Sequence, residues 1–486
     1  MRNIERGFVL RKIFTPTLIL FPPRVRGKLA HPFGGENFSA AHSCSARSPA
    51  RPSLAGRSRL ARSPLTHRTF SCFRLTPHRG GGNVLSPSPC ARGLGGGGVI
   101  VVLMLILAGC ATARDMGNLR GTGDLGVVVE RASGTVQVVD TTTRAVLGQV
   151  AGLGDLSHAT VVFSRDERYA YVFGRDGGLT QVDILSRRIV KRVLQSGNSI
   201  GGTISQDGRT IAVANYTPGG VKLFRSDTLE QVADIPAIGA DGKSSKVVGL
   251  IAAPGGRFVY SLYDAGEIWM LDAQNPAHPV VHKFTGIGRQ PYDGLITPNG
   301  RYYIAGLFGE DGMALLDLWH PERGVKRILD GYGKGTQRLP VYKMPHLEGW
   351  GFYGRYAFVP AVGHHEVLVI DTDTWQQAGA IPVHGQPVFV VGQPYSRYVW
   401  GNFAFPDNDT VQVIDVVTQR VVHELKPGKG VMFMEFTPRG ENAWVSARDS
   451  DEVVVYDTGS LRPLAQLASR KPSGIFFTPR ATRLGW

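Results

Sequence analysis

The sequence has 486 residues, of which 42% are hydrophobic and 19% are charged. This composition is typical of a large globular core and excludes a chain that is disordered throughout. The formal net charge is +15, but residues 1–109 carry about +14 of it, with 16 Lys+Arg against 2 Asp+Glu. Because the rest of the chain is nearly neutral, its folded part does not need a polyanionic partner, and nucleic-acid binding is not expected.

The first segment, residues 1–98, is rich in Arg, Pro, Ser and Gly and shows no sustained strand or helix period. We interpret it as upstream sequence added by a misplaced start codon, or as a segment removed on processing. A basic tail or transit segment is the alternative. This part is therefore not expected to belong to the fold.

An apolar run follows over residues 99–108 and ends in Leu107-Ala108-Gly109-Cys110. The run is short for a membrane span. Its end resembles a bacterial lipobox, which implies that Cys110 is lipidated and becomes the mature N-terminus. Ala111, in place of Asp, favours the periplasmic side of the outer membrane. An ordinary cleaved signal peptide is the alternative, and residues 111–124 would form a tether.

All four cysteines lie at or before position 110. The remainder of the chain can therefore form no disulfide, Cys-ligated zinc site, iron–sulfur cluster or thiol nucleophile of its own.

From residue 125 to 486 the pattern is all-β, with alternating apolar residues between turns of Gly, Asp, Asn and Pro. A tight turn recurs, as in Ser164–Arg168, Ser205–Arg209 and Thr297–Arg301. A second signature follows about fifteen residues later in five units and ends a third strand in Asp, as in Gln181-Val182-Asp183 and Val413-Ile414-Asp415. The period of about 42–53 residues is that of a four-stranded propeller blade.

These repeats predict an eight-bladed β-propeller, with seven blades as the disfavoured alternative. Seven whole blades begin near His158 and after it. The last blade is expected to be closed by both chain ends, with two outer strands from residues 127–150 and inner strands from residue 473 onward. Such closure leaves no open sheet edge.

In a propeller, the loop leading into each innermost strand and the loop between the second and third strands lie on one face, around the central channel. Three histidines and several cations fall in these loops. Such a ring suits a flat ligand that bears several carboxylates and can hold a metal. The candidates are His158, Asp241, Lys246, Arg289, Lys343, His346 and His384 in the incoming loops, and Arg175, Tyr216, Asp264 and Arg448 in the others.

Other polar features carry less weight. A single surface histidine is more often solvated than a ligand, and we interpret His282, His364, His365 and His423 in this way. The Gly-rich segment 197–202 lacks the strand-to-helix context of a dinucleotide fingerprint, which disfavours an NAD site.

Several stretches carry a resemblance to known families: Leu156–Asp183, Gly306–Gly312, Lys343–Trp350 and Asn402–Asp415. From about residue 120 onward the chain resembles the d1-haem domain of cytochrome cd1 nitrite reductase. It resembles more closely the NirF family of haem d1 biosynthesis. The Cys-x-x-Cys-His motif of the c-type haem in the nitrite reductases is missing, which favours handling of the cofactor over nitrite reduction.

The resemblance implies roles for individual residues. His158 matches the proximal iron ligand and would be an axial ligand or a base. His346 matches a distal histidine, and His384 falls near the other. Arg175 and Lys246 would clamp carboxylates, and Asp241 and Asp264 would orient or deprotonate the ligand. The remaining candidates, Tyr216, Arg289, Lys343 and Arg448, would contact the cofactor.

The expected function is therefore binding of haem d1 or its dihydro precursor during a late biosynthetic step. That step is either dehydrogenation of the tetrapyrrole or its propionate side chain, or holding and delivery to a partner enzyme. Expected partners are other haem d1 biosynthesis proteins and the nitrite reductase, and a homodimer is allowed. The alternatives are a ligand-free periplasmic scaffold and a propeller enzyme acting on a soluble substrate.

Overall fold

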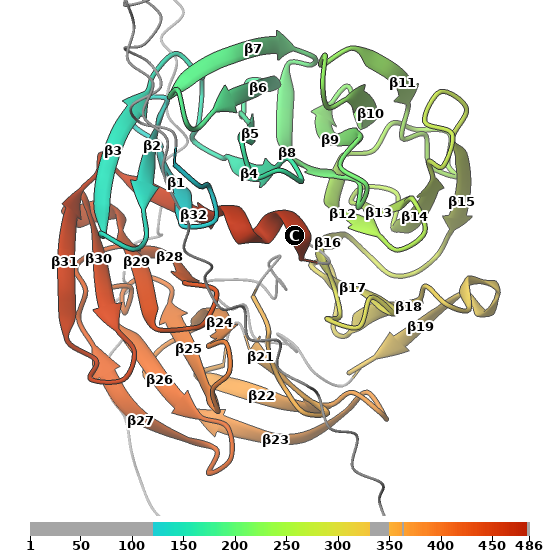
Figure 1. Ribbon diagram of the computed structural model, residues 1–486. Coiled ribbons are helices and arrows are strands. Elements are labelled where there is room, and N and C mark those ends of the chain that lie inside the picture. The colour runs from blue at the N-terminus through green and yellow to red at the C-terminus, as the bar shows by residue number, and fades with distance from the viewer. Residues whose placement is uncertain (1–119, 331–348, 362–363, 484–486) are drawn as a thin grey trace, which may run out of the picture. The chain divides into compact units, whose positions relative to one another are not determined.

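The computed structural model describes residues 120–330, 349–361 and 364–483, all of which belong to one compact unit, Gly95–Trp486. Its strands form eight four-stranded antiparallel sheets that radiate around a ring (Figure 1). The predicted eight-bladed propeller is confirmed, and the seven-bladed alternative is wrong. None of the helices in the described ranges has the length and apolar character that crossing a bilayer requires.

The blades are numbered here in chain order from the first complete one. Blade 1 consists of β4 (Thr160–Phe163), β5 (Tyr169–Phe173), β6 (Gly178–Asp183) and β7 (Arg188–Leu194), and blade 2 of β8 (Asn198–Ile204), β9 (Thr210–Thr217), β10 (Gly220–Arg225) and β11 (Gln231–Ile235). Blade 3 consists of β12 (Val247–Ala253), β13 (Arg257–Leu262), β14 (Glu267–Asp272) and β15 (Val280–Phe284), and blade 4 of β16 (Pro291–Ile296), β17 (Tyr302–Leu307), β18 (Met313–Asp317) and β19 (Val325–Ile328).

Blade 5 consists of β20 (Gly351–Tyr353), β21 (Tyr356–Ala361), β22 (Glu366–Asp371) and β23 (Gln376–Pro382), and blade 6 of β24 (Pro387–Gly392), β25 (Tyr398–Phe403), β26 (Val411–Asp415) and β27 (Arg420–Leu425). Blade 7 consists of β28 (Val431–Phe436), β29 (Asn442–Ala447), β30 (Glu452–Asp457) and β31 (Pro463–Ala468), and blade 8 of β1 (Leu125–Glu130), β2 (Thr135–Asp140), β3 (Ala145–Val150) and β32 (Pro472–Phe477). Short 3-10 helices in the described ranges are η2 (Pro321–Arg323), η3 (Arg448–Ser450) and η4 (Thr478–Thr482).

Burial follows the position of each strand in its blade. Every residue of the third strand β6 is buried, because both faces of the sheet pack against neighbouring blades. The outermost strand β7 has no buried residue. The core is therefore distributed between the blades.

The eighth blade joins the two ends of the described propeller. β32 is its innermost strand and pairs antiparallel with β1, with Gly126 opposite Phe477. Strands β1, β2 and β3 supply the other three. The prediction that residues 127–150 form only two outer strands is therefore wrong, because β1 takes the second position of the blade, beside the innermost strand.

An ion pair recurs on the first turn of four blades. In each, an arginine just before the second strand reaches the aspartate that ends the third strand, and its guanidinium lies over the ring of the following tyrosine. The nitrogen–oxygen distances are 2.9 Å for Arg168–Asp183, 2.8 Å for Arg301–Asp317, 2.7 Å for Arg355–Asp371 and 2.8 Å for Arg397–Asp415. This contact explains the conspicuous spacing of turn and Asp in the repeat.

Candidate ligand-binding cavity

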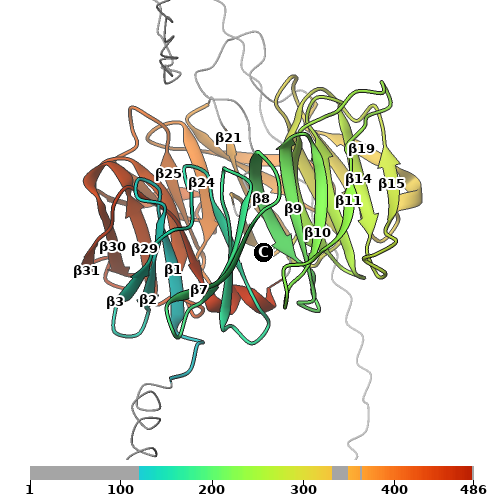
Figure 2. The same ribbon diagram turned by 90° about the horizontal axis from the view of Figure 1, so that it is seen from above.

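A cavity of about 560 Å³ occupies the centre of the ring. Its walls come from the innermost strands of seven blades: β4, β8, β12, β16, β24, β28 and β32. The volume is in the range of small-molecule and cofactor sites. The short helix η4 follows β32 and contributes Arg480 to the cavity lining. It lies across the centre of the ring in Figure 1 and at one face of the ring in Figure 2.

His158 is an exposed residue that lines this cavity, just before β4 begins. Ser157, which precedes His158 in the chain, accepts a hydrogen bond at its carbonyl oxygen from the guanidinium of Arg131. The structure therefore places the predicted histidine at the channel, where an imidazole nitrogen can serve as an iron ligand or as a base.

Arg131 and Arg448 line the same cavity as His158. Burial lowers the pKa of the Arg131 guanidinium, and the positive charge of Arg448 lowers it further. Arg448 itself makes hydrogen bonds of 2.9 and 2.7 Å to the carboxylate of Asp449. Asp155 also acts on the Arg131 charge. Two guanidinium groups in the lining make this wall a suitable place for a ligand carboxylate.

Arg131 was not among the predicted site residues. Its turn connects β1 to β2, and these strands were assigned to the outside of the blade. Once β1 is recognised as the second strand, the same rule that selected Arg448 also selects Arg131.

A cluster of aromatic residues borders the cavity on blades 2 to 4. Tyr292 of β16 lines the cavity, and its ring contacts those of Tyr263 and Phe308, with centroids 5.9 and 5.6 Å away. Burial raises the pKa of the Tyr292 hydroxyl strongly, and Tyr216 beside it adds to the shift. Arg175 lies over the ring of Tyr216 at 5.1 Å, and both residues interact with Tyr292, so these two predicted residues lie next to a residue that lines the cavity.

Lys246 and Asp264 form an ion pair of 2.8 Å at the edge of this cluster, with the Lys246 ammonium 5.2 Å from the Tyr263 ring centroid. Neither lines the cavity. Asp241 lies farther out, exposed at a loop tip where its carboxylate accepts a hydrogen bond of 3.0 Å from the Lys243 backbone.

The remaining predicted residues are spread around the face. Arg289 is 74% exposed and pairs with Glu310 at 3.2 Å. His384 is 3.6 Å from Asp407 and packs edge-on against Phe403, a cavity-lining residue, at 5.8 Å. Lys343, His346 and Cys110 lie outside the described residues.

Sequence reasoning also missed the apolar surface of the cavity. Phe389, Phe405 and Phe433 line it, and Phe405 is 72% exposed. They were missed because only polar residues were sorted by loop. Aromatic side chains at a channel give a flat conjugated ligand a surface on which to stack.

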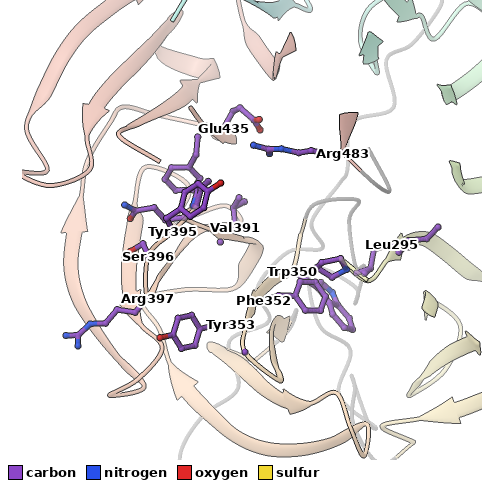
Figure 3. Close-up of a pocket in the computed structure, with 17 residues that line it drawn as sticks. Leu295, Trp350, Phe352, Tyr353, Val391, Tyr395, Ser396, Arg397, Glu435 and Arg483 are labelled. Atoms are coloured by element: carbon purple, nitrogen blue, oxygen red, sulfur yellow. The ribbon is translucent and has the colours of Figure 1, made fainter. Parts of the chain in front are cut away.

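A second cavity, of about 800 Å³, lies among the opposite ends of β16, β24 and β28. Figure 3 shows Trp350 and Phe352 on one side of it and Val391 and Tyr395 on another. It contains none of the predicted site residues. Arg480 lines the first cavity, and Glu435 lines the second. These two residues form a buried ion pair with each other.

The fold and this cavity define a propeller domain of the d1-haem type. The sequence profile described as "Cytochrome D1 heme domain" matches residues 120–481. Protein NirF of Stutzerimonas stutzeri is 60% identical over 385 residues, which cover 79% of this chain and 98% of that protein. The chain belongs to the NirF family, as the sequence resemblance predicted.

Two further similarities concern one kind of enzyme. The dihydro-heme d1 dehydrogenase of Pseudomonas aeruginosa is 33% identical over 329 residues, covering 66% of this chain and 64% of that protein. A solved structure of the dihydro-heme d1 dehydrogenase NirN in complex with DHE superimposes with a TM-score of 0.66 and 27% identity, covering 76% of this chain and 79% of that one.

Proposed function

We propose that the channel cavity binds haem d1 or its dihydro precursor, and that the protein acts in a late step of haem d1 biosynthesis. The observation that carries the proposal is that His158, Arg131 and Arg448 line one cavity of about 560 Å³. Similarity to NirF and to a dihydro-heme d1 dehydrogenase supports the same class of ligand.

The residues present fit such a ligand. The imidazole of His158 would hold the iron or accept a proton, and the two arginines would hold carboxylates at the edge of the macrocycle. Phe389, Phe405 and Phe433 would contact its face. His384, held near Asp407, and the Arg175–Tyr216 pair would act from the rim. The bound tetrapyrrole would supply the redox-active centre.

Two versions of the step differ in chemistry. In one, the protein removes two hydrogens from the tetrapyrrole or its propionate side chain, for which a side chain must accept a C–H proton and an electron acceptor must take part. In the other, it holds the ligand and delivers it to a partner enzyme. Incubation of the protein with dihydro-haem d1 and an electron acceptor, followed by mass spectrometry for the loss of two hydrogens, separates them.

The binding test uses purified protein titrated with haem d1, with the Soret band as readout. His158→Ala should alter the ligated spectrum, whereas His423→Ala, an exposed residue of β27, should not. An unchanged His158→Ala spectrum would remove the axial role. Failure of the unaltered protein to bind any tetrapyrrole would favour a ligand-free scaffold.

Location is part of the same proposal. A lipid on Cys110 would tether the propeller to the periplasmic side of the outer membrane, near other haem d1 biosynthesis proteins and the nitrite reductase. Replacement of Cys110 by Ser should release the protein from the membrane fraction if this is correct.

A further inference from the structure

Asp293 has an unusual backbone for a residue of a strand. It belongs to β16, the innermost strand of blade 4, and it lines the channel cavity. Its φ is 56°, and it is the single non-glycine residue with a positive φ inside any of the described strands. Such a conformation is sterically costly for an L-residue, although Asp tolerates it better than most.

The equivalent position in the preceding blade shows what the backbone alone would favour. Strands β12 and β16 carry the same bulge, between Val248 and Ile251 and between Tyr292 and Leu295. Gly249 occupies the position in β12, with φ of 61°. Glycine adopts this conformation without a steric penalty. The Asp293 carboxylate accepts a hydrogen bond of 3.0 Å from the Gly294 backbone N–H, which helps Asp to tolerate a positive φ, but a glycine would satisfy the backbone without placing a charge in the cavity.

The surroundings hold Asp293 in this conformation. A Cβ on Gly249 would lie 2.4 Å from the carbonyl of Asp293, so the two bulges are in direct contact. A Cβ on Gly294 would lie 2.4 Å from the hydroxyl of Tyr303. That hydroxyl donates to the Gly249 carbonyl at 2.9 Å and contacts Ser261 at 3.0 Å. Strained residues that are held this firmly occur mainly at functional sites.

The charges that line the cavity are distributed unevenly. Asp293 is the single carboxylate among the described lining residues, and the lining cations are Arg131, Arg448 and Arg480. Arg131 belongs to blade 8, four blades away from blade 4 in a ring of eight. Figure 1 accordingly shows β16 and β32 on opposite sides of the ring centre. Asp293 therefore lies across the ring from Arg131.

We propose that Asp293 contacts the bound tetrapyrrole and fixes its orientation. The edge of the ligand that carries the fewest carboxylates would then face blade 4. This inference rests on the proposed function, since it assumes an anionic flat ligand in the channel. A fixed carboxylate repels ligand carboxylates, and rejection of the wrong arrangement contributes to specificity as well as attraction of the right one.

The test compares two iron porphyrins that differ in where their carboxylates lie. Iron protoporphyrin IX has both on one edge, whereas iron coproporphyrin III has four around its rim. Dissociation constants for each are measured with the unaltered protein, Asp293→Asn, Asp293→Gly and the control Asp227→Asn. Asp227 is an exposed turn residue far from the channel, and its replacement changes the net charge by the same amount.

The coproporphyrin-to-protoporphyrin ratio of dissociation constants should fall by about tenfold in both Asp293 variants and stay constant in Asp227→Asn. Asp293→Gly should also be the more heat-stable of the two, because it removes the steric cost. It keeps the test valid if the Asn variant folds poorly. An unchanged ratio in the Asp293 variants overturns this inference alone, whereas failure of the unaltered protein to bind either porphyrin overturns the proposed function and the inference with it.

Discussion

The carboxylate of Glu130 accepts a hydrogen bond of 2.8 Å from the backbone N–H of Arg470, although 340 positions separate the two residues. Glu130 ends β1 and is 1% exposed. Its oxygens also accept hydrogen bonds from Thr135 at 2.5 Å and from Gln137 at 3.1 Å. This buried carboxylate therefore joins the first strand of the propeller to the loop that leads into the last one.

Replacing Glu130 by Ala should weaken ring closure, because several buried donors lose their acceptor at once. We expect a loss of about 2–4 kcal/mol in the free energy of unfolding. Urea denaturation followed by tryptophan fluorescence measures this loss. Glu322→Ala, at an exposed side chain of blade 4, is the matched control, and equal stability of the two variants would contradict the role of Glu130.

Arg131 and Arg448, which line the channel cavity, should determine affinity for the tetrapyrrole. Arg131→Ala should weaken haem d1 binding by about tenfold or more, because a ligand carboxylate would lose its charged hydrogen-bond partner. The effects of Arg131→Ala and Arg448→Ala should not add, since both side chains face the same part of the cavity. Absorbance titration measures both, with the exposed Arg420→Ala as control. Strictly additive losses would place the two arginines on separate ligand groups.

The buried pair between Arg480 and Glu435 separates the two cavities, and each side chain is 5% exposed. Arg480→Ala should cost about 3–5 kcal/mol, because it leaves the Glu435 charge buried without its partner. The double variant Arg480→Met with Glu435→Leu should cost less, since no charge is then left buried. Arg225→Ala, which breaks an exposed pair with Asp227, should change stability by less than about 1 kcal/mol. If Arg480→Ala were as stable as the double variant, the unpaired Glu435 charge would not be the cause of the loss.

The Arg301–Asp317 pair should make stability depend on pH in the acid range. Burial raises the pKa of the Asp317 carboxyl, but hydrogen bonds from Arg301 and the Trp319 backbone outweigh it, so the pKa lies below its ordinary value. A carboxyl with a lowered folded pKa contributes stability that is complete above about pH 4 and is lost as pH falls through the folded value. Urea midpoints at pH 6 and pH 3 should therefore differ less in Arg301→Ala than in the unaltered protein. An equal difference in both would show that this pair does not contribute.

The sequence by itself determined the repeat, and through it the class of fold. Each blade is an antiparallel meander whose strands pair with their chain neighbours, so alternation and turn residues are visible locally. The positions of Ser164–Arg168 and Asp183, and of their equivalents, were therefore sufficient to recognise a propeller of seven or eight blades, and the structure decided for eight. The same register placed His158 at the mouth of the channel, and family resemblance supplied its expected role.

Only the tertiary structure decided the features that depend on contacts between distant parts of the chain. The division of the closing blade, and with it the position of Arg131, depends on pairing between β1 and β32, which no local pattern specifies. Likewise, the backbone of Asp293 is set by Gly249 and Tyr303 of neighbouring strands. Local sequence determines the hairpins because their partners are adjacent in the chain, whereas the walls of the channel form only when all eight blades close the ring.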